Sequence, residues 1–426
     1  ENSLLDKEAL KRATSIYLVD RVVPMLPEKL SNHLCSLRPN EDKLCYSSVC
    51  EMDEHGVVHE KWFGRTVIHS LKRFTYEEAQ QVLNAGEGIF AHELKQLNKL
   101  AKILRKERFK QGAIAFEKTE TRFELDEQGN PVGVYLKETL ETNQLIEEFM
   151  LLANRHVAEL IGKTRGRKND FVYRIHEGPV TDRIADFARL ASAFGYKVNT
   201  SNDRTIGHSL NKLLQDVKGK DEQNMLEQLA IRSMAKAKYS TKNIGHYGLA
   251  FEHYTHFTSP IRRYPDVMVH RLLDNFLEKK QLSTKNLEDR CKHCTQMEIA
   301  ATDAERSSIK FMQAKYLKEK TGQEFPGIIS GLTDWGIFVE LTESKCEGMI
   351  RMRDLEDDFY EFDNFNFQIK GNRTGKIYRL GDHVRVKVKR TDLVKKQIDF
   401  VLVTDKRKSD RKKHHDDSHR RHRSRR

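Results

Sequence analysis

The sequence predicts an α+β fold: a helix-rich, mixed α/β block over residues 1–320, a small five-stranded OB-fold barrel over residues 321–404, and a disordered basic tail over residues 405–426. Three observations lead to this prediction. Apolar residues recur at helical spacing in the first block, short β-type runs replace them in the second segment, and the last segment has no apolar periodicity. A length of 426 residues is also more than one domain usually needs.

The clearest helices lie in the first block. Thr142 can cap a helix that runs to about residue 161, because apolar residues from Leu145 onward form one stripe along it. Glu148 lies at the flank of that stripe, and Glu147 lies further round the helix. The other helices that the spacing predicts cover residues 207–217, 223–238, 264–279 and 286–320.

The segment after residue 320 has the pattern of a small β-barrel. Val384, Val386 and Val388 alternate with basic residues, which is the period-two pattern of a half-buried strand. Short strands joined by tight turns, with a long third connection, fit an OB fold. The predicted strands cover residues 325–330, 336–341, 347–351, 382–390 and 397–402.

The charge of the chain favours a polyanionic partner. The formal net charge is +12, which suits nucleic acid or an anionic membrane surface. Residues 404–426 hold eleven Lys or Arg and four Asp or Glu, so they supply +7 of it, and a basic surface on the folded part is a hypothesis. No run of about 18 apolar residues occurs, so no membrane-spanning helix is predicted.

The six cysteines are too sparse for a disulfide scaffold, and no signal peptide opens the chain. A reducing, cytoplasmic compartment is therefore predicted. Cys291 and Cys294 have the spacing of a zinc-binding pair, but no second pair accompanies them. Because they fall at the start of a predicted helix, core packing is the favoured interpretation.

The strongest chemical signal is the segment 253–266, His-Tyr-Thr-His-Phe-Thr-Ser-Pro-Ile-Arg-Arg-Tyr-Pro-Asp. Its Thr258-Ser-Pro stretch predicts a turn or a helix entrance, where free backbone N–H groups and the helix dipole favour an anion. Arg262 and Arg263 follow at once, and guanidinium groups bind phosphate oxygens in pairs. The segment is a phosphate clamp by composition; the alternative is a capped helix with two solvated arginines.

Four long motifs follow one another along the chain: Thr14–Pro27, Leu145–Asn154 with Tyr173–His176, Thr258–Asp266 with His270 and Arg271, and Ala304–Arg306. In this order they resemble the catalytic RNB domain of the ribonuclease II and ribonuclease R family. The region after residue 320 is similar to the S-one type RNA-binding domain that ends those enzymes. The resemblance covers about residues 1–403, and the basic tail favours ribonuclease R over ribonuclease II.

The resemblance implies a processive 3′→5′ exoribonuclease that threads single-stranded RNA through a deep channel and releases nucleoside 5′-monophosphates. Tyr17 matches one ring of an aromatic clamp near the 3′ end, and Phe116 matches the other. Tyr76 matches the aromatic residue that fixes the terminal nucleotide. Stacking suits an enzyme that acts on any sequence, because every base has a flat face.

The resemblance also implies roles for charged residues. Arg262 matches the catalytic arginine at the scissile phosphate, and Arg263 lies beside it. The acidic partner near the last nucleotide matches Glu148, the favoured catalytic candidate, or its neighbour Glu147. A solvated helix face is the alternative role of these glutamates.

In the predicted barrel, Trp335 and Phe338 are candidates for stacking on RNA bases, and core packing is the alternative for each. Arg351 occupies a position where many similar domains carry His, and from which an arginine can contact phosphate.

One feature of the family does not occur in the sequence. The resemblance implies Mg²⁺ bound by an Asp-x-Asp-Asp run a few tens of residues before the Tyr17 motif, but only 16 residues precede Tyr17 here. We therefore expect the metal ligands upstream of Glu1, an active parent protein and an inactive fragment. The alternative is a non-catalytic RNA-binding protein. In both cases we expect a monomer that binds single-stranded RNA and no membrane.

Overall fold

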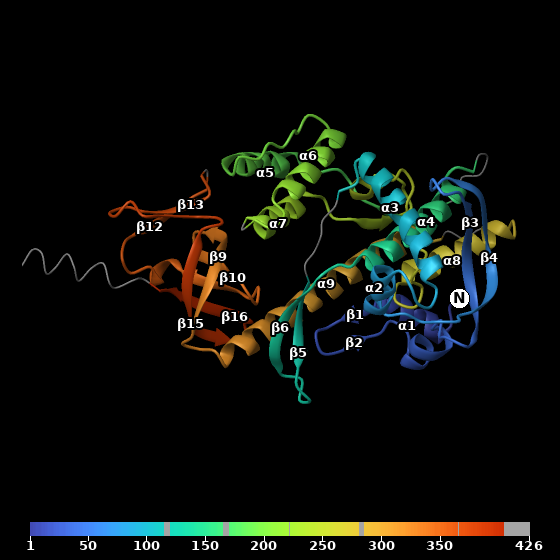
Figure 1. Ribbon diagram of the computed structural model, residues 1–426, viewed down its shortest axis with the longest axis horizontal. Helices are drawn as coiled ribbons and strands as arrows, with labels where there is room; N and C mark the ends of the chain where they lie inside the picture. The colour runs from blue at the N-terminus through green and yellow to red at the C-terminus, as the bar shows by residue number, and fades with distance from the viewer. Residues whose placement is uncertain (115–119, 165–169, 221, 281–284, 365, 404–426) are drawn as a thin grey trace, which may run out of the picture. The chain divides into compact units, whose positions relative to one another are not determined.

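The computed structural model describes residues 1–114, 120–164, 170–220, 222–280, 285–364 and 366–403 (Figure 1). Contacts between Cα atoms divide the chain into two compact units. The first unit comprises residues 1–122 and 136–309, and the second comprises residues 123–135 and the chain from residue 310. Within the described ranges, no helix is long and apolar enough to cross a membrane.

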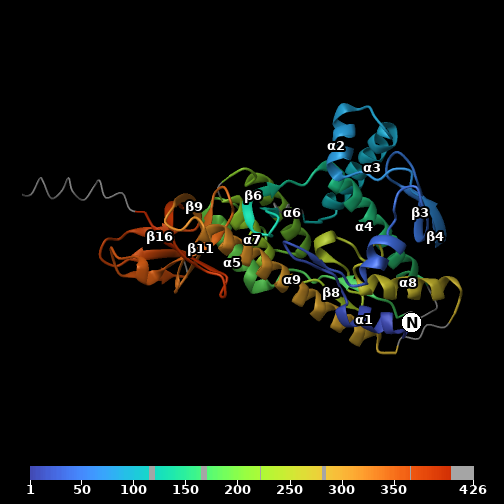
Figure 2. The same ribbon diagram turned by 90° about the horizontal axis from the view of Figure 1, so that it is seen from below.

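Helices dominate the first unit. They are α1 (Leu4–Arg12), α2 (Tyr76–Ala85), α3 (Ala91–Lys110), α4 (Glu141–Gly162), α5 (Thr181–Ala193), α6 (Asp203–Asp216), α7 (Gln223–Ser233), α8 (Tyr264–Leu277) and most of α9 (Leu287–Lys318), with the shorter η1 (Lys29–Leu34) and η2 (Tyr247–Leu249). Local sequence explains the ends of α2: Thr75 and Glu78 form a capping box, and Gly86 ends the helix in the left-handed conformation at φ 75°. Figures 1 and 2 both show α3 beside α4.

The predicted cap of α4 was wrong. The helix begins at Glu141, and Leu140 occupies the N-cap position. Thr142 lies inside the first turn, where its hydroxyl donates a 2.9 Å hydrogen bond to the carbonyl oxygen of Tyr76. The hydroxyl therefore ties α4 to α2 instead of capping its own helix.

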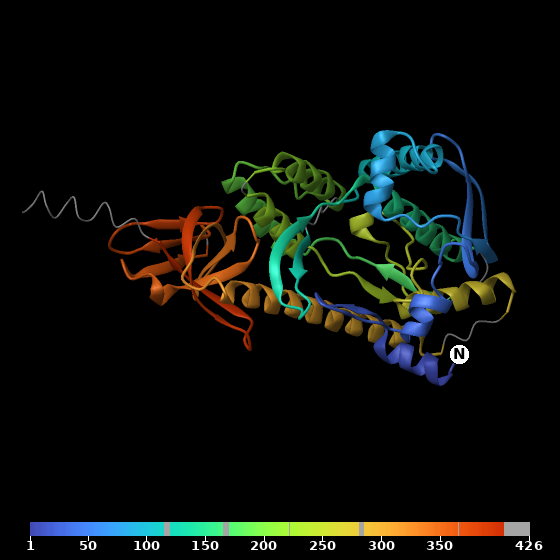
Figure 3. The ribbon, with the colours of Figure 1, turned by 60° about the horizontal axis from the view of Figure 1, so that its bottom comes forward.

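Helix α7 is shorter than the spacing predicts, because it ends at Ser233. The residues that follow leave the helix so that β8 (Lys238–Ser240) can pair antiparallel with β7 (Tyr173–Ile175). The remaining strands of the first unit also pair as antiparallel ribbons, β1 (Ile16–Tyr17) with β2 (Val22–Val23), and β3 (Asp42–Met52) with β4 (Val58–His69). Figure 3 shows β3 and β4 as a long blue hairpin.

The core of the first unit gathers residues from α1, α4, β7, α8 and the start of α9. Val157, Tyr264 and Val269 are wholly buried in it. Cys291 and Cys294 belong to the same cluster, as the packing interpretation predicts, and burial raises the pKa of both thiols.

The second unit is built on a closed barrel with the strand order β10–β11–β16–β15–β9. These strands are β9 (Glu324–Thr333), β10 (Gly336–Leu341), β11 (Glu347–Arg351), β15 (His383–Asp392) and β16 (Gln397–Leu402). Val386 and Val388 are buried while their neighbours on β15 are exposed, so the predicted alternation is confirmed. The long third connection carries η3 (Met352–Asp354) and a sheet of β12 (Tyr360–Asp363), β13 (Gln368–Gly371) and β14 (Ile377–Arg379).

The α+β fold class, with a mixed α/β part followed by a five-stranded OB barrel, is confirmed. A further hairpin, β5 (Glu120–Leu125) and β6 (Pro131–Lys137), contributes to both units. The predicted disordered tail lies outside the described residues.

Buried histidines give the first unit a predictable response to acid. Burial lowers the pKa of His156 to about 4 and that of His246 to about 3, from an ordinary 6.5. Unfolding restores the ordinary value, so the unfolded chain binds more protons than the folded chain between pH 6.5 and about 4. The free energy of unfolding therefore falls as the pH falls through this window. His156 alone accounts for a loss of about 2 kcal/mol at about pH 5, relative to neutral pH.

Urea unfolding at about pH 7.5 and about pH 5 tests this expectation. We expect His156→Gln to lose less stability between the two pH values than the unchanged protein, because the substituted side chain no longer takes up a proton on unfolding. Equal losses in the two proteins would contradict the assignment.

Candidate functional site

The Thr258–Arg263 turn, which leads into α8, is closed by a buried carboxylate. Asp266 is wholly buried and accepts a 2.7 Å hydrogen bond from the backbone N–H of Ser259. It also accepts 2.9 Å hydrogen bonds from Nε and Nη2 of Arg263. The backbone N–H groups of Arg262 and Arg263 donate to the Ser259 carbonyl oxygen at 3.3 and 3.1 Å. The sequence predicted either a turn or a helix entrance for this segment, and the structure shows a turn.

The N-terminal segment is hydrogen-bonded to this turn. The backbone N–H of Ser15 donates to the carbonyl oxygen of Arg262 at 3.0 Å, and the N–H of Tyr264 donates to that of Ala13 at 2.8 Å. Tyr17 follows two residues after Ser15 and is about half exposed, and its backbone N–H donates to a Glu305 carboxylate oxygen at 2.9 Å. The structure thus brings the segments of Tyr17 and Arg262, far apart in the sequence, side by side.

The other end of the turn is held by side chains of α4 and α8. The amide oxygen of Asn154 accepts a 2.8 Å hydrogen bond from the backbone N–H of Phe257, and its amide nitrogen donates to the Tyr254 hydroxyl at 3.1 Å. Nε2 of His270 donates to the Phe257 carbonyl oxygen at 2.7 Å. Burial lowers the pKa of His270, which keeps its ring neutral. Polar side chains therefore fix the turn at both ends.

Some polar side-chain groups of the turn have no protein partner among the described residues. The guanidinium of half-buried Arg262 forms neither a hydrogen bond nor an ion pair there. The hydroxyl oxygen of Thr258 is buried and also has no hydrogen-bond partner. These two groups remain available for a ligand.

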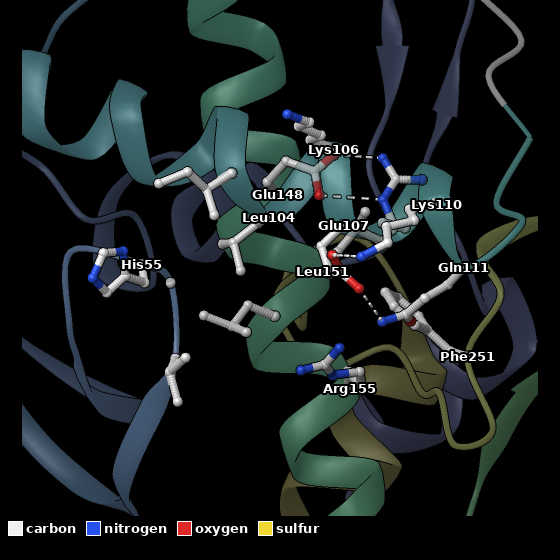
Figure 4. Close-up of a pocket in the computed structure, with 15 residues that line it drawn as sticks. His55, Leu104, Lys106, Glu107, Lys110, Gln111, Glu148, Leu151, Arg155 and Phe251 are labelled. Atoms are coloured by element: carbon white, nitrogen blue, oxygen red, sulfur yellow. Dashed lines mark hydrogen bonds and ion pairs between the residues drawn. The ribbon is translucent and has the colours of Figure 1, made fainter.

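Glu148 and Glu147 take part in an ion-pair network between α4 and α3. Glu148 is buried, and its carboxylate lies 2.5 Å from Nη2 of Arg108, which is also buried. Arg105 lies 3.3 Å from Glu148 and 3.5 Å from Glu147, whose side chain is half exposed. Glu148 and Arg108 line a cavity of about 640 Å³ between α3, α4 and the β3–β4 turn (Figure 4). Both glutamates are thus paired within the protein, but Glu148 is buried whereas Glu147 also reaches solvent.

The first unit also contains a thiol–imidazole pair, which has the wrong protonation for a nucleophile. Sγ of Cys50 lies 3.4 Å from Nδ1 of His156. Burial raises the pKa of the Cys50 thiol and lowers that of His156, so both groups are neutral near pH 7. We therefore assign this pair to packing.

The remaining aromatic candidates of the first unit are Tyr76 and Phe116. Tyr76 is the first residue of α2, and its ring is 40% exposed, so it can stack on a base. Its carbonyl oxygen receives the Thr142 hydroxyl near the start of α4. Phe116 lies outside the described residues.

In the barrel, Trp335 is 78% exposed at the tip of the β9–β10 turn, whereas Phe338 on β10 is half-buried. Gly336, the first residue of β10, permits the close approach to β11, because a Cβ there would lie 2.1 Å from the carbonyl oxygen of Ile350. Arg351 lies opposite Gly336 on β11, and its guanidinium is 3.0 Å from the Asp399 carboxylate. Core packing therefore does not account for Trp335, while Arg351 is partly neutralised by an internal partner.

The described residues do not form a metal site. Nowhere among them do three His, Cys, Asp or Glu side chains gather as ligands of one ion. The residues present thus do not fit the Mg²⁺ that the resemblance implies, and no chemical step is assigned to a metal here.

Sequence reasoning missed three residues that shape the site: Asp266, Asn154 and Arg108. The three-residue spacing between Arg263 and Asp266 at a helix start was a usable signal for their ion pair. Asn154 and Arg108 meet their partners only through tertiary packing, about 100 and 40 residues away in the chain, so no local pattern marks them.

An α/β unit with an anchored, arginine-bearing turn, followed by an OB barrel, has the architecture of a nucleic-acid-binding protein. Residues 1–279 match the RNB domain, and residues 318–402 match the S1 RNA binding domain. The chain belongs to the RNB family, so the predicted resemblance is confirmed.

Curated relatives and solved structures agree with this assignment. The chain is 38% identical to Ribonuclease R of Aquifex aeolicus over 95% of the chain and 58% of the relative, and 33% identical to Ribonuclease R of Escherichia coli over 95% and 51%. A structure of Mycoplasma genitalium RNase R in complex with ribose-methylated single-stranded RNA superposes with a TM-score of 0.89 at 29% identity, covering 95% of this chain and 64% of that one. The chain therefore spans little more than half the length of these curated relatives.

Proposed function

We propose that the chain is the RNA-gripping and phosphate-positioning part of a processive 3′→5′ exoribonuclease that degrades single-stranded RNA to nucleoside 5′-monophosphates. The observation that carries the proposal is the Thr258–Arg263 turn, anchored at both ends, with an unpaired Arg262 guanidinium beside the segment of exposed Tyr17. RNB family membership and relatives named Ribonuclease R support it.

In this proposal, Arg262 contacts the scissile phosphate and stabilises the negative charge that develops during hydrolysis. A fork-shaped guanidinium is suited to this task, because it offers several donors to the phosphate oxygens. Tyr17, Tyr76 and Phe116 stack on bases, and Glu147 or Glu148 contacts the terminal nucleotide. Both carboxylates pair with Arg108, but Glu147 is half exposed whereas Glu148 is buried, and this exposure favours Glu147 for direct contact. The Mg²⁺ that the resemblance implies would have to be held by residues outside the described ranges, where it would supply an activated water.

The barrel adds a second RNA contact in the same proposal. Exposed Trp335 provides a stacking surface, and half-buried Phe338 and Arg351 lie close to it along β10 and β11.

We propose a catalytic domain over residues 1–320, an RNA-binding domain over residues 321–404 and a basic tail after it, in a cytoplasmic monomer. The absence of disulfides among the six cysteines is consistent with a reducing compartment.

Degradation of a 5′-labelled oligoribonucleotide by the protein expressed from its complete gene, with Mg²⁺ added, tests the proposal. We expect a ladder that shortens from the 3′ end and nucleoside 5′-monophosphates as released products. Tight RNA binding without any cleavage would replace the proposal with a non-catalytic RNA-binding protein. Cleavage from the 5′ end would reject it.

The exposed ring of Tyr76 gives a further expectation. Tyr76→Ala should change the length of the shortest end product, because a missing stacking partner, worth about 1–3 kcal/mol per base, weakens the grip on the last nucleotides. Tyr135→Ala, at a similarly exposed ring on β6, serves as the control. High-resolution gel separation of the final products measures the effect, and an unchanged end product would argue against this role.

A further inference from the structure

We propose that Asp266 is a positioning residue of the phosphate site: it holds the Thr258–Arg263 turn so that Arg262, and not Arg263, meets the RNA. This inference rests on the proposed function, because it concerns how the arginine assigned to the scissile phosphate is held in place.

Asp266 is placed to fix the turn. It lies at the third position of α8, where the helix dipole favours a carboxylate, and its side chain is wholly buried. One oxygen receives the backbone N–H of Ser259 and Nη2 of Arg263, and the other receives Nε of Arg263. One buried group thus links the start of the turn, its end and the helix that follows.

The two neighbouring arginines therefore have different roles. The Arg263 side chain is only 15% exposed and binds Asp266 through two parallel hydrogen bonds. The Arg262 side chain has no partner among the described residues, although its backbone is held by Ser15 and Ser259. The contact that occupies Arg263 also holds the backbone from which Arg262 extends. We accordingly reassign Arg263 from RNA contact to support of the turn.

Loss of the Asp266 charge should act on catalysis through Arg262. A displacement of about 1 Å at a catalytic group can cost about 10²-fold in rate, while substrate held elsewhere still binds. We therefore expect Asp266→Asn, in the protein expressed from its complete gene, to lower kcat by about 10²-fold and to change KM by less than about threefold. Asp266→Glu, which keeps the carboxylate, should recover part of the loss.

A double-mutant cycle separates positioning from a general structural role. If Asp266 acts only through Arg262, then adding Asp266→Asn to Arg262→Ala should cost almost nothing further. Asp274→Asn is the matched control, because Asp274 lies on the same helix and pairs with Arg65 away from the turn. Thermal unfolding of each variant checks the fold. If Asp266→Asn does not fold, Arg263→Gln removes the same ion pair and should reproduce the kcat effect.

Each outcome decides one point. Full turnover in Arg262→Ala would reject the proposed role of that arginine. Lost turnover in Arg262→Ala together with normal turnover in folded Asp266→Asn would reject only the present inference. Additive losses in the double variant, or an effect confined to KM, would also overturn it.

A second inference rests on a different observation, the buried Thr258 hydroxyl that lacks a partner among the described residues. A buried hydroxyl without a hydrogen bond costs folding free energy, so it needs an explanation, and a bound ligand is one of them. Thr258 directly precedes the residue whose carbonyl oxygen closes the turn onto Arg262. We infer that its hydroxyl donates to an oxygen of the phosphate that Arg262 contacts.

Thr255, three residues earlier, provides the matched control. Its hydroxyl is also buried but donates a 2.6 Å hydrogen bond to the carbonyl oxygen of Val172. Thr258→Val should leave the Tm within about 2 °C and lower kcat/KM by about tenfold, while Thr258→Ser should retain activity. Thr255→Val should lower the Tm by more and spare kcat/KM in the remaining folded protein. If Thr258→Val lowers the Tm as much as Thr255→Val, or leaves kcat/KM unchanged, the hydroxyl is not a phosphate ligand.

Discussion

Replacing Arg262 by alanine should lower cleavage of single-stranded RNA by about 10²–10³-fold while RNA affinity changes by less than about threefold. The guanidinium has no protein partner among the described residues, so its removal leaves no buried charge behind and should not unfold the turn. Aromatic stacking and the barrel retain the RNA. Single-turnover cleavage and fluorescence anisotropy, both on the protein expressed from its complete gene, measure the two quantities.

Two further variants sharpen this result. Arg262→Lys keeps the charge but not the fork, and we expect an intermediate rate. Arg189→Ala, at an exposed position of α5, should leave the rate unchanged and serves as the control. Near-normal turnover in Arg262→Ala would remove this residue from the mechanism, and weakened binding with normal turnover would make it a binding residue only.

Replacing Arg108 by methionine should lower the free energy of unfolding by about 3–5 kcal/mol. Arg108 and Glu148 are 5% and 3% exposed, so loss of Arg108 removes the shortest ion pair of a buried carboxylate and leaves Glu148 only Arg105, 3.3 Å away, as a partner. Equilibrium unfolding in urea measures the effect. Replacing both partners, with Arg108→Met and Glu148→Leu together, should recover most of the lost free energy of unfolding, because an apolar pair of similar size is tolerated in such sites.

The exposed ion pair of Arg122 and Glu120 on β5 is the reference for this experiment. Both side chains are more than half exposed, so Arg122→Met should cost no more than about 1 kcal/mol. If Arg108→Met also has only a small effect, then Arg105 or water compensates the charge of Glu148, and the expected cost is refuted.

The two arginines of the turn show what the sequence can and cannot predict. Composition marks both Arg262 and Arg263 as phosphate ligands, since adjacent arginines are chemically identical in the chain. The family resemblance, and not the composition, assigns Arg262 to the scissile phosphate. The folded structure adds a physical difference between the two arginines, because Asp266 is buried where it binds the Arg263 guanidinium. Composition therefore predicted the site as a segment, but not the partner of each arginine.

Glu148 and Thr142 illustrate the same limit on α4. Helical spacing placed Glu148 at the flank of the apolar stripe, which is compatible with burial, but its partner Arg108 comes from another helix. Thr142 has the side chain of a cap, yet a carbonyl oxygen of α2 accepts its hydrogen bond instead. Tertiary partners decide both cases. The barrel was easier to predict, because the alternation along β15 depends on one buried face alone.

The backbone hydrogen bonds between residues 13–15 and residues 262–264 fix the distance between the segment of Tyr17 and the segment of Arg262. The strand that ends in Tyr17 cannot shift along the turn without breaking them. If Tyr17 stacks on a base and Arg262 contacts the phosphate that is cleaved, the number of nucleotides between the stacked base and the cleaved bond is constant. The RNA would then be shortened by the same number of nucleotides at each step, whatever its sequence.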